Sequence, residues 1–500
     1  MTAAEAYARL EARFNRLGAL GEVNSLLGWD LATIMPPGSG ESRGQQLAAL
    51  DVTTHELIME PAVADWLDEA EAANEGLDAW QRANVREMRR RHRRATALTA
   101  RLVEALAVAR QRCEETWREA RARSDFAMVR GPFQDVLVLL REAADAKAAV
   151  LGLTPYEALL ADSESGFSQQ RIAQLFGELQ GVLPGILAAA MERQRVREPA
   201  MPLPGPFPVG AQESLGRRVM ALVGFDFRRG RLDRSLHPFS AGTPDDSRIT
   251  TRYDEDDFSR ALMGVMHETG HAMYEMGLPP RWRRQPVGEA RGMALHESQS
   301  LLIEMQAGRS PAFLGFLAPF AAAAFGRSGP AWSAENFRRV YHRVEPSLIR
   351  VDADEVTYPL HVILRWRLEQ ALLSGDLALA DLPGAWNDGF ASLLGIRPPN
   401  DRLGCLQDIH WYDGSIGYFP TYTLGALAAA QLFAAAVRAV PDIPAALARG
   451  DFRPLLAWLR DNVHARASSL ESDEIIATAT GKPLGTDAFL SHLRRRYLED

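Results

Sequence analysis

The sequence predicts a mainly α-helical protein that carries one small β-hairpin. Over about the first 200 residues Ala, Leu, Glu and Arg dominate, apolar residues recur at spacings of three and four, and runs of β-branched residues are scarce. Between residues 236 and 253 this pattern stops, and the turn Gly242-Thr243-Pro244-Asp245 is followed by a strand-like segment at 248–251. Helical patterns then resume and continue to the end of the sequence.

Two proline-rich segments interrupt the N-terminal helices. The first is MPPG at 35–38, and the second is MPLPGPFPVG at 201–210, where four prolines forbid a helix. The second segment fits either a linker between domains or a surface crossing within one domain. The basic cluster RRRHRR at 89–94 is predicted to be a solvated helix face offset by glutamates elsewhere, and not a patch that binds RNA.

Composition and charge exclude several classes of protein. Hydrophobic residues make up 47% of the chain and charged residues 24%, which is ordinary for a soluble globular protein. The 56 Lys and Arg against 64 Asp and Glu give a net charge of −8, so we expect no nucleic-acid or anionic-membrane partner. Two cysteines, Cys113 and Cys405, exclude a disulfide scaffold and favour a reducing compartment.

The sequence gives only weak signals for a targeting segment or a membrane anchor. The N-terminal sequence MTAAEAYARLEARFNRLG lacks the apolar stretch of a signal peptide. The longest apolar run, 424–437, has about 14 residues and is short for a membrane span. We therefore expect a cytoplasmic protein.

A candidate metal site lies in the sequence HETGH at 267–271. Acidic residues at 254–257 favour a helix start just before it, and Gly277 followed by two prolines favours a helix end after it. Histidines four residues apart project from the same helix face, so both imidazoles can bind one ion, with Glu268 beside it. This pattern predicts a zinc peptidase site with Glu268 as general base. The alternative is an amphipathic helix whose histidines pack or face solvent.

A third ligand is available on the next predicted helix. Glu297 follows His271 by 26 positions, near the start of the segment GMALHESQSLLIEMQAG. A His₂Glu set leaves a fourth position open for water, which is typical of catalytic zinc. His296 is the alternative ligand, but adjacent helix positions point about 100° apart, so only one of the two can face the ion. We expect Glu297 to be the ligand.

Six motifs together resemble the carboxypeptidase Taq family of metallocarboxypeptidases. The resemblance covers nearly the whole chain, from Trp29-Asp30 and MPPG to GYFPTY at 417–422. The motifs are HPF at 237–239, DSRITT at 246–251, HETGH at 267–271, HESQ at 296–299, IRVDAD at 349–354 and GCLQDIHW at 404–411.

The resemblance implies a fold, a cofactor and an activity. It implies one mostly helical domain over residues 1–500, with an N-terminal helical part over about 1–200 and a catalytic part over about 230–430. The deep cleft would be similar to that of neurolysin and angiotensin-converting enzyme, with the hairpin at its edge pairing with the substrate backbone. The chain would be a homodimeric exopeptidase that removes single residues from peptide C-termini with broad specificity. It would hold one Zn²⁺ per chain, which Co²⁺ or Mn²⁺ could replace.

The resemblance also assigns roles to residues after the metal motif. His410 and Tyr422 would donate hydrogen bonds to the oxyanion, with Tyr418 as the competitor of Tyr422. Arg350 would bind the terminal carboxylate of the substrate, because a guanidinium pairs with a carboxylate through two hydrogen bonds. The alternative for Arg350 is a buried ion pair with Asp352 or Asp354.

Further residues are expected near the cleft. Arg248 is the second choice for the substrate carboxylate, although bracing the hairpin through Asp246 is the more natural role for it. His237 is expected to contact substrate, and Gln407 to lie nearby. Asp354 and Asp408 are the candidates for the carboxylate that orients a metal-binding histidine, and Cys405 is expected to pack as a small apolar side chain.

Two other functions fit parts of the sequence. One is a zinc oligopeptidase that cuts internal bonds with the same metal machinery. The other is a helical binding scaffold that has lost catalysis, although the intact set of ligands, base and arginine argues against it. Blocking the substrate C-terminus with an amide separates an exopeptidase from an oligopeptidase.

Overall fold

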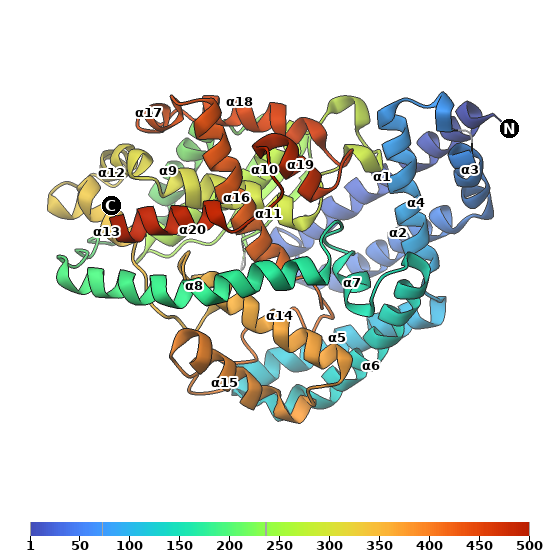
Figure 1. Cartoon of the computed structure of the whole chain (residues 1–500), viewed down its shortest axis with the longest axis horizontal. Helices are drawn as coiled ribbons and strands as arrows, with labels where there is room; N and C mark the ends of the chain where they lie inside the picture. The colour runs from blue at the N-terminus through green and yellow to red at the C-terminus, as the bar shows by residue number, and fades with distance from the viewer. Residues whose placement is uncertain (1, 73, 236–237, 500) are drawn as a thin grey trace.

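The protein is seen in a computed structural model that describes residues 2–72, 74–235 and 238–499. Helices form almost the whole frame, as predicted (Figure 1). In the N-terminal half they are α1 (Ala3–Thr33), α2 (Gly40–Met59), α3 (Pro61–Ala72), α4 (Ala79–Thr96), α5 (Ala100–Arg123), α6 (Phe126–Leu151), α7 (Pro155–Leu160), α8 (Gln169–Val196) and α9 (Val209–Val223). Both proline-rich breaks are confirmed, since they fall between α1 and α2 and between α8 and α9.

The C-terminal half contains the helices that carry the metal motif. They are α10 (Phe258–Gly277), α11 (Met293–Leu301), α12 (Pro311–Ala324), α13 (Ala334–Tyr341), α14 (Tyr358–Ser374), α15 (Leu382–Leu394), α16 (Pro420–Ala439), α17 (Ile443–Leu447), α18 (Arg453–Asn462), α19 (Ser472–Thr480) and α20 (Asp487–Arg494). In Figure 1 α1–α4 gather at one end of the molecule, and α8 crosses its middle in front of α16 and α14.

The described residues form one sheet of three strands in the order β1-β3-β2. The strands are β1 (Gly230–Arg234), β2 (Ser240–Thr243) and β3 (Asp246–Thr251); β2 is antiparallel to β3, and β1 is parallel to it. The predicted hairpin is therefore confirmed as β2–β3. The sequence did not reveal β1, because its sequence GRLDR contains one apolar residue, Leu232, and only that residue is buried.

Two main hydrophobic cores hold the helices together, beside a small cluster of Ala83, Trp282 and Val287. The large core extends from Leu102 to Tyr497 and contains α10, α11 and α16, while a small core extends from Ala6 to Met88 and joins α1, α3 and α4. By length and composition α8 and α16 could each cross a membrane. In α16, however, 72% of the apolar window is buried inside the protein, which is the position of a core helix.

The metal motif lies where three of these core helices come very close together. A Cβ atom on Gly270 of α10 would lie 2.5 Å from the carbonyl oxygen of Gln299 and 2.6 Å from the Cα of Ser300, both on α11. A Cβ atom on Gly425 of α16 would lie 2.8 Å from the Cβ of Glu297. Glycine at these two positions allows α10 and α16 to touch α11 on either side of Glu297.

We expect Gly270→Ala to destabilise the protein by about 1–3 kcal/mol, because the added methyl group overlaps backbone atoms that cannot rotate away. Thermal unfolding of the metal-free protein measures the effect as a lower Tm. The matched control is Gly264→Ala on the same helix, where an added Cβ meets no atom within 4 Å. This control should be neutral or slightly stabilising, since Ala favours helix over Gly. Equal Tm values for the two variants would contradict the close contact.

Candidate metal centre

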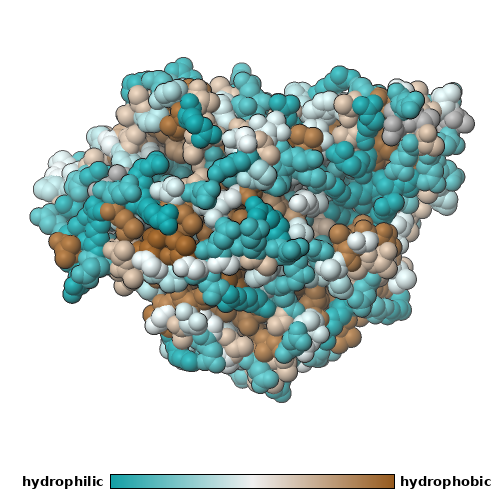
Figure 2. Space-filling view, viewed as in Figure 1, coloured by the Kyte–Doolittle hydropathy of each residue, from teal (hydrophilic) through white to brown (hydrophobic). Residues whose placement is uncertain are grey.

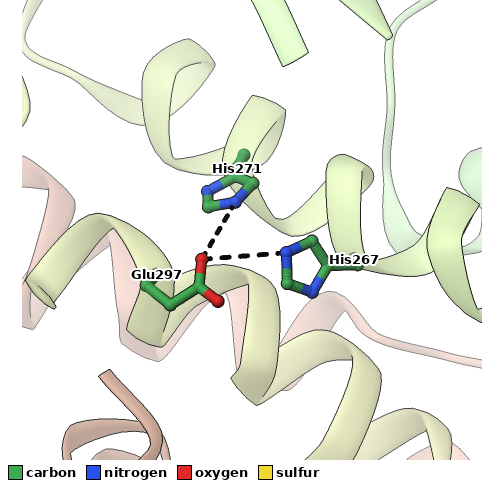
Figure 3. Close-up of side chains that lie close together, drawn as sticks. All are labelled: His267, His271 and Glu297. Atoms are coloured by element: carbon green, nitrogen blue, oxygen red, sulfur yellow. Dashed lines mark ion pairs between the residues drawn. The ribbon is translucent and has the colours of Figure 1, made fainter. Parts of the chain in front are cut away.

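The helix that carries HETGH begins and ends where the sequence predicts. The side chain of Asp257 caps α10 by accepting a hydrogen bond from the backbone N–H of Ser259 at 2.8 Å, and the helix ends at Gly277. A capped start fixes the rotation of the first turn, and the periodicity of the helix then sets the direction of every side chain. His267 and His271 consequently project from one face, toward α11 (Figure 3).

Glu297 completes a group that has the geometry of a metal site. Its Oε2 atom lies 3.7 Å from Nε2 of His267 and 3.4 Å from Nε2 of His271 (Figure 3). Ligand bonds of about 2.0–2.2 Å around a tetrahedral ion place neighbouring ligand atoms about 3.4 Å apart. The three predicted ligands thus converge at the right spacing without any rearrangement.

His296, the alternative ligand, lies outside this group. Its ring stacks on that of His271, with the ring centroids 4.5 Å apart and the planes inclined by 28°. Its Nε2 atom lies 3.0 Å from Oε1 of Glu275. His296 therefore packs against the ring of His271 and does not face the ligand group.

A carboxylate that the sequence analysis did not single out orients His267. Oε2 of Glu304 lies 3.0 Å from Nδ1 of His267, and the other oxygen of Glu304 accepts a hydrogen bond from Arg309 at 2.5 Å. In a metal-binding histidine, the ring nitrogen that does not bind the metal characteristically donates its N–H to a carboxylate in this way. Glu304 follows Glu297 by seven residues, two helical turns, and this spacing could have indicated that both face α10.

The two predicted partners for the histidines, Asp354 and Asp408, are wrong. Asp354 instead accepts hydrogen bonds from the backbone of Glu345, Val356 and Thr357. Asp408 pairs with Arg350 and Arg365.

Glu304 lies on a π-helical turn, η5 (Leu302–Gly308), that continues α11. Such turns are frequent at functional sites, where they redirect side chains that a regular helix would place elsewhere.

The electrostatics of the site favour a bound cation. Burial opposes a charge on His267, yet the carboxylates of Glu297 and Glu304 outweigh burial and raise its pKa to about 10. Burial likewise opposes a charge on Glu297, yet the two histidines lower its pKa to about 2. The shift of His267 shows that the carboxylates favour positive charge beside them, whereas burial lowers the pKa of His271 to about 4 and keeps its ring neutral. The residues present therefore fit a divalent metal ion.

Glu268 faces the same space without being part of the ligand group. It lies on α10 between the two histidines, lines a cavity of about 730 Å³ together with His267 and Glu297, and is only 8% exposed. Burial raises the pKa of its carboxyl group to about 7, although His267 opposes the shift. A carboxyl group with a pKa near neutrality can both accept and return a proton.

Arg350 lines the same cavity, at the start of the short helix η7 (Arg350–Asp352). Its Nε and one terminal nitrogen lie 3.1 and 2.9 Å from Oδ1 of Asp408, and its other terminal nitrogen lies 3.2 Å from the hydroxyl of Tyr358. The alternative pairing with Asp352 or Asp354 is therefore wrong. Arg365 binds the second oxygen of Asp408 at 2.6 Å. Two guanidinium groups share one carboxylate, which leaves one positive charge uncompensated.

The predicted hydrogen-bond donors lie beside Arg350. The hydroxyl of Tyr422 lies 3.0 Å from Nε2 of His410, and the Tyr422 ring lies under the Arg350 guanidinium, 4.7 Å from its carbon. Tyr422 lines the cavity that contains Glu268, whereas Tyr418 lines the neighbouring cavities. Burial raises the pKa of Tyr422 to about 12, so its hydroxyl keeps its proton at neutral pH.

Comparison with known proteins identifies the same family over nearly the whole chain. The model of the carboxypeptidase Taq (M32) metallopeptidase family matches residues 9–497. The chain belongs to this family. It is 38% identical to thermostable carboxypeptidase 1 of Thermus thermophilus, over 99% of both chains. Two solved structures have the same fold. Trypanosoma cruzi metallocarboxypeptidase 1 is 40% identical, with a TM-score of 0.97 over 99% of this chain and all of that one. The M32 carboxypeptidase of Deinococcus radiodurans is 34% identical, with a TM-score of 0.91 over 99% of both chains.

The family membership makes the chain a metallocarboxypeptidase that requires a divalent metal. The relatives carry carboxypeptidase names, so the oligopeptidase alternative is not favoured.

The remaining predicted residues of this M32 chain have structural contacts. Arg248 binds both carboxylate oxygens of Asp246 and lies 4.2 Å from the centre of the Trp29 ring, so it makes the bracing contact that was expected as its more natural role. Gln407 accepts hydrogen bonds from the backbone of Arg350 and from the side chain of Arg365. His237 lies outside the described residues, next to Pro238, which lines the cavity. Cys405 is buried, as expected for a packing side chain.

We expect Glu304→Gln to weaken metal binding about 10- to 100-fold, because the amide cannot fix the orientation and basicity of His267 as a carboxylate does. Titration of the metal-free protein with Zn²⁺ against a competing chelator measures the affinity. Glu275→Gln is the matched control, since Glu275 contacts His296 and none of the three ligands. Unchanged affinity in Glu304→Gln would show that Glu304 has no influence on the metal.

Proposed function

We propose that this metallocarboxypeptidase removes single residues from peptide C-termini by means of Glu268, Arg350 and Tyr422, around a metal held by His267, His271 and Glu297. One observation carries the proposal: Glu268, two of the three ligands (His267 and Glu297) and Arg350 line one cavity of about 730 Å³. A divalent ion bound there would supply a Lewis acid and a water molecule of lowered pKa.

Arg350 would select and place the substrate. The cluster of Arg350, Arg365 and Asp408 has one uncompensated positive charge, and a terminal carboxylate neutralises it. Tyr358 already accepts one hydrogen bond from Arg350, and a carboxylate is a stronger acceptor than a phenol. With the carboxylate held there, the last peptide bond is the one that reaches the metal ligands.

Glu268 would move the proton. As the water oxygen attacks the carbonyl carbon of the last peptide bond, Glu268 accepts a proton from that water. The protonated carboxyl group then donates it to the amide nitrogen as the C–N bond breaks. The products are a shortened peptide and a free amino acid, and Glu268 returns to its starting state.

Tyr422 would donate a hydrogen bond to the carbonyl oxygen as negative charge develops there. Its hydroxyl is free to do so when the Nε2–H of His410 donates to it. Burial lowers the pKa of His410 to about 4, so the ring is neutral and one of its nitrogens can carry that hydrogen. His410 therefore acts through Tyr422 in this scheme.

Four further features of the protein are proposed on the family resemblance. They are Zn²⁺ as the resident ion, with Co²⁺ or Mn²⁺ as substitutes, one ion per chain, a homodimeric assembly, and one catalytic domain over residues 1–500. A cytoplasmic location is also supported by Cys113 and Cys405, which are both buried and unpaired.

The purified protein is expected to release the C-terminal residue of a blocked tripeptide. A chelator should abolish release and added Zn²⁺ or Co²⁺ should restore it, because the attacking water needs the metal. Glu268→Gln should lower kcat by at least about 10²-fold, since the amide cannot accept a proton. Metal content measured alongside should stay at one ion per chain, which separates loss of the base from loss of the ion. Metal-loaded protein that releases nothing from any peptide with a free C-terminus would contradict the proposal.

Arg350→Lys should lower kcat/KM about 10²-fold for a peptide with a free C-terminus, because a lysine cannot replace two directed hydrogen bonds. The same peptide with a C-terminal amide should be a poor substrate for the wild type and change little in the variant. Measuring kcat/KM for both peptides with both proteins gives four values, from which the effect of the substitution on each peptide can be compared. If the two peptides lost activity equally on substitution, the arginine would be structural and would not recognise the carboxylate.

A further inference from the structure

We propose that the upstream part of a peptide substrate extends along two connected cavities to helix α4, and that acidic side chains about four or more residues upstream of the cleaved bond are favoured. The proposal rests on the proposed function, because it requires Arg350 to hold the C-terminus.

The cavities have a fixed order along the metal-binding helix. The cavity with Arg350 is lined on α10 by Gly264, His267 and Glu268, whereas a second cavity of about 720 Å³ is lined by Glu275 and, just beyond the helix, Leu278. The same order holds on α11 and its π-helical continuation, where the first cavity contacts Glu297 to Met305 and the second contacts Met293 and His296. The metal ligands lie at the boundary. In the proposed binding mode, a substrate whose carboxylate is in the first cavity follows this order and continues from the metal toward the second.

The second cavity leads to a third, which has a volume of about 850 Å³. The two share lining residues Arg90, Arg94, Ala161 and Ser165, so they open into each other beside α4. The surface over α4 is largely hydrophilic (Figure 2). The cluster at 89–94 is thus not simply a solvated face, as the sequence suggested: Arg89, Arg90, Arg93 and Arg94 line the third cavity.

Charge differs between the two cavities. In the second, most arginines have a carboxylate partner: Arg91 pairs with Glu289, Arg283 with Asp245 and Arg284 with Glu22. The third is lined by six arginines, Arg82, Arg86, Arg89, Arg90, Arg93 and Arg94, but only three acids, Glu71, Glu157 and Glu164. Away from Arg94, which borders both cavities, the second cavity therefore offers an anionic side chain few unpaired cations, whereas the third offers it several.

Three of the arginines at the third cavity have no ion-pair partner in the described part of the chain. Arg94 donates only to the carbonyl oxygen of Ala161, and its buried Nε has no acceptor. Arg82 donates only to the carbonyl oxygen of Leu77, and Arg93 is exposed. A buried or half-buried guanidinium gains most from a carboxylate, which supplies acceptors in the geometry of its N–H groups.

The helix segment between the metal ligands and the second cavity sets the position of the preference. From His271 to Leu278 the helix rises about 10 Å, at about 1.5 Å per residue. An extended peptide covers that distance with about three residues. Side chains from about the fourth position upstream onward would then reach the third cavity.

Three sets of eight-residue peptides test this directly. They share one C-terminal residue and carry a pair of Glu, Gln or Lys, either two and three or five and six positions upstream of the cleaved bond. At low salt the distal Glu pair should raise kcat/KM about three- to tenfold over Gln, the distal Lys pair should lower it, and the proximal pairs should differ little. Salt at 0.5 M should reduce the distal preference, since it screens charges at partly open sites.

The variant Arg93→Glu should abolish the distal preference and leave release from a blocked tripeptide unchanged. Arg195→Glu is the control, because Arg195 is 75% exposed on α8 and lines none of these cavities. A distal preference that survives Arg93→Glu, or Glu and Lys peptides cleaved equally well, would overturn the proposal. Failure to cleave the tripeptide would instead overturn the proposed function.

Discussion

The close contact of α10 with α11 is the constraint on which the rest of the site depends. Two histidines on one helix can face a common point, but a metal site needs a third ligand at about 3.4 Å from both. Only a near approach of the two backbones brings Glu297 to that distance, and Gly270 permits it. Gly425 then lets α16 cover Glu297 from the other side. Because α16 begins just after the segment that carries His410 and itself carries Tyr422, the same contact sets the distance between the ligands and the hydrogen-bond donors.

The site separates its charges into two groups that orient a substrate. Around the ligands, Arg309 pairs with Glu304, and the carboxylates of Glu268 and Glu297 remain beside the two histidines, so this group favours a cation. Around Asp408, two arginines exceed one carboxylate, so that group favours an anion. Buried charges are costly unless they are paired, and each group is left with an excess of one sign that a specific partner neutralises. The metal satisfies the first group and the substrate carboxylate would satisfy the second.

The parts of the fold and the site that could be predicted are those that depend on short segments. The spacing of His267 and His271, the capping acid Asp257 and the terminating Gly277 are properties of a single helix, and the structure has them as predicted. Glu297 could be predicted because only one of two adjacent residues can face the ion. The spacing of Glu304 from Glu297 could have indicated its helix face, but not its contact with Nδ1 of His267, because a π-helical turn and the packing of α11 on α10 bring the two side chains together.

What the sequence could not show is the joining of distant segments. Asp408 lies 58 residues after Arg350, and no local pattern indicates that it, and not Asp352 or Asp354, is the partner. Strand β1 pairs in parallel with β3 through a sequence that has no strand periodicity. The arginines at 89–94 look like a solvated face on their own helix, and they line a cavity only because residues 151–168 fold against them.

The geometry of Arg350 also bears on why removal of single terminal residues, and not cleavage within a chain, suits this site. The Arg350 side chain is only 6% exposed, and Arg365, behind the shared carboxylate, is fully buried. A terminal carboxylate fits against such a guanidinium because it ends there and cancels the remaining charge. A continuing peptide would bring a neutral amide, which leaves the charge unbalanced. The uncompensated positive charge that attracts the chain end and the burial that strengthens this attraction therefore act together, and either one alone would discriminate less.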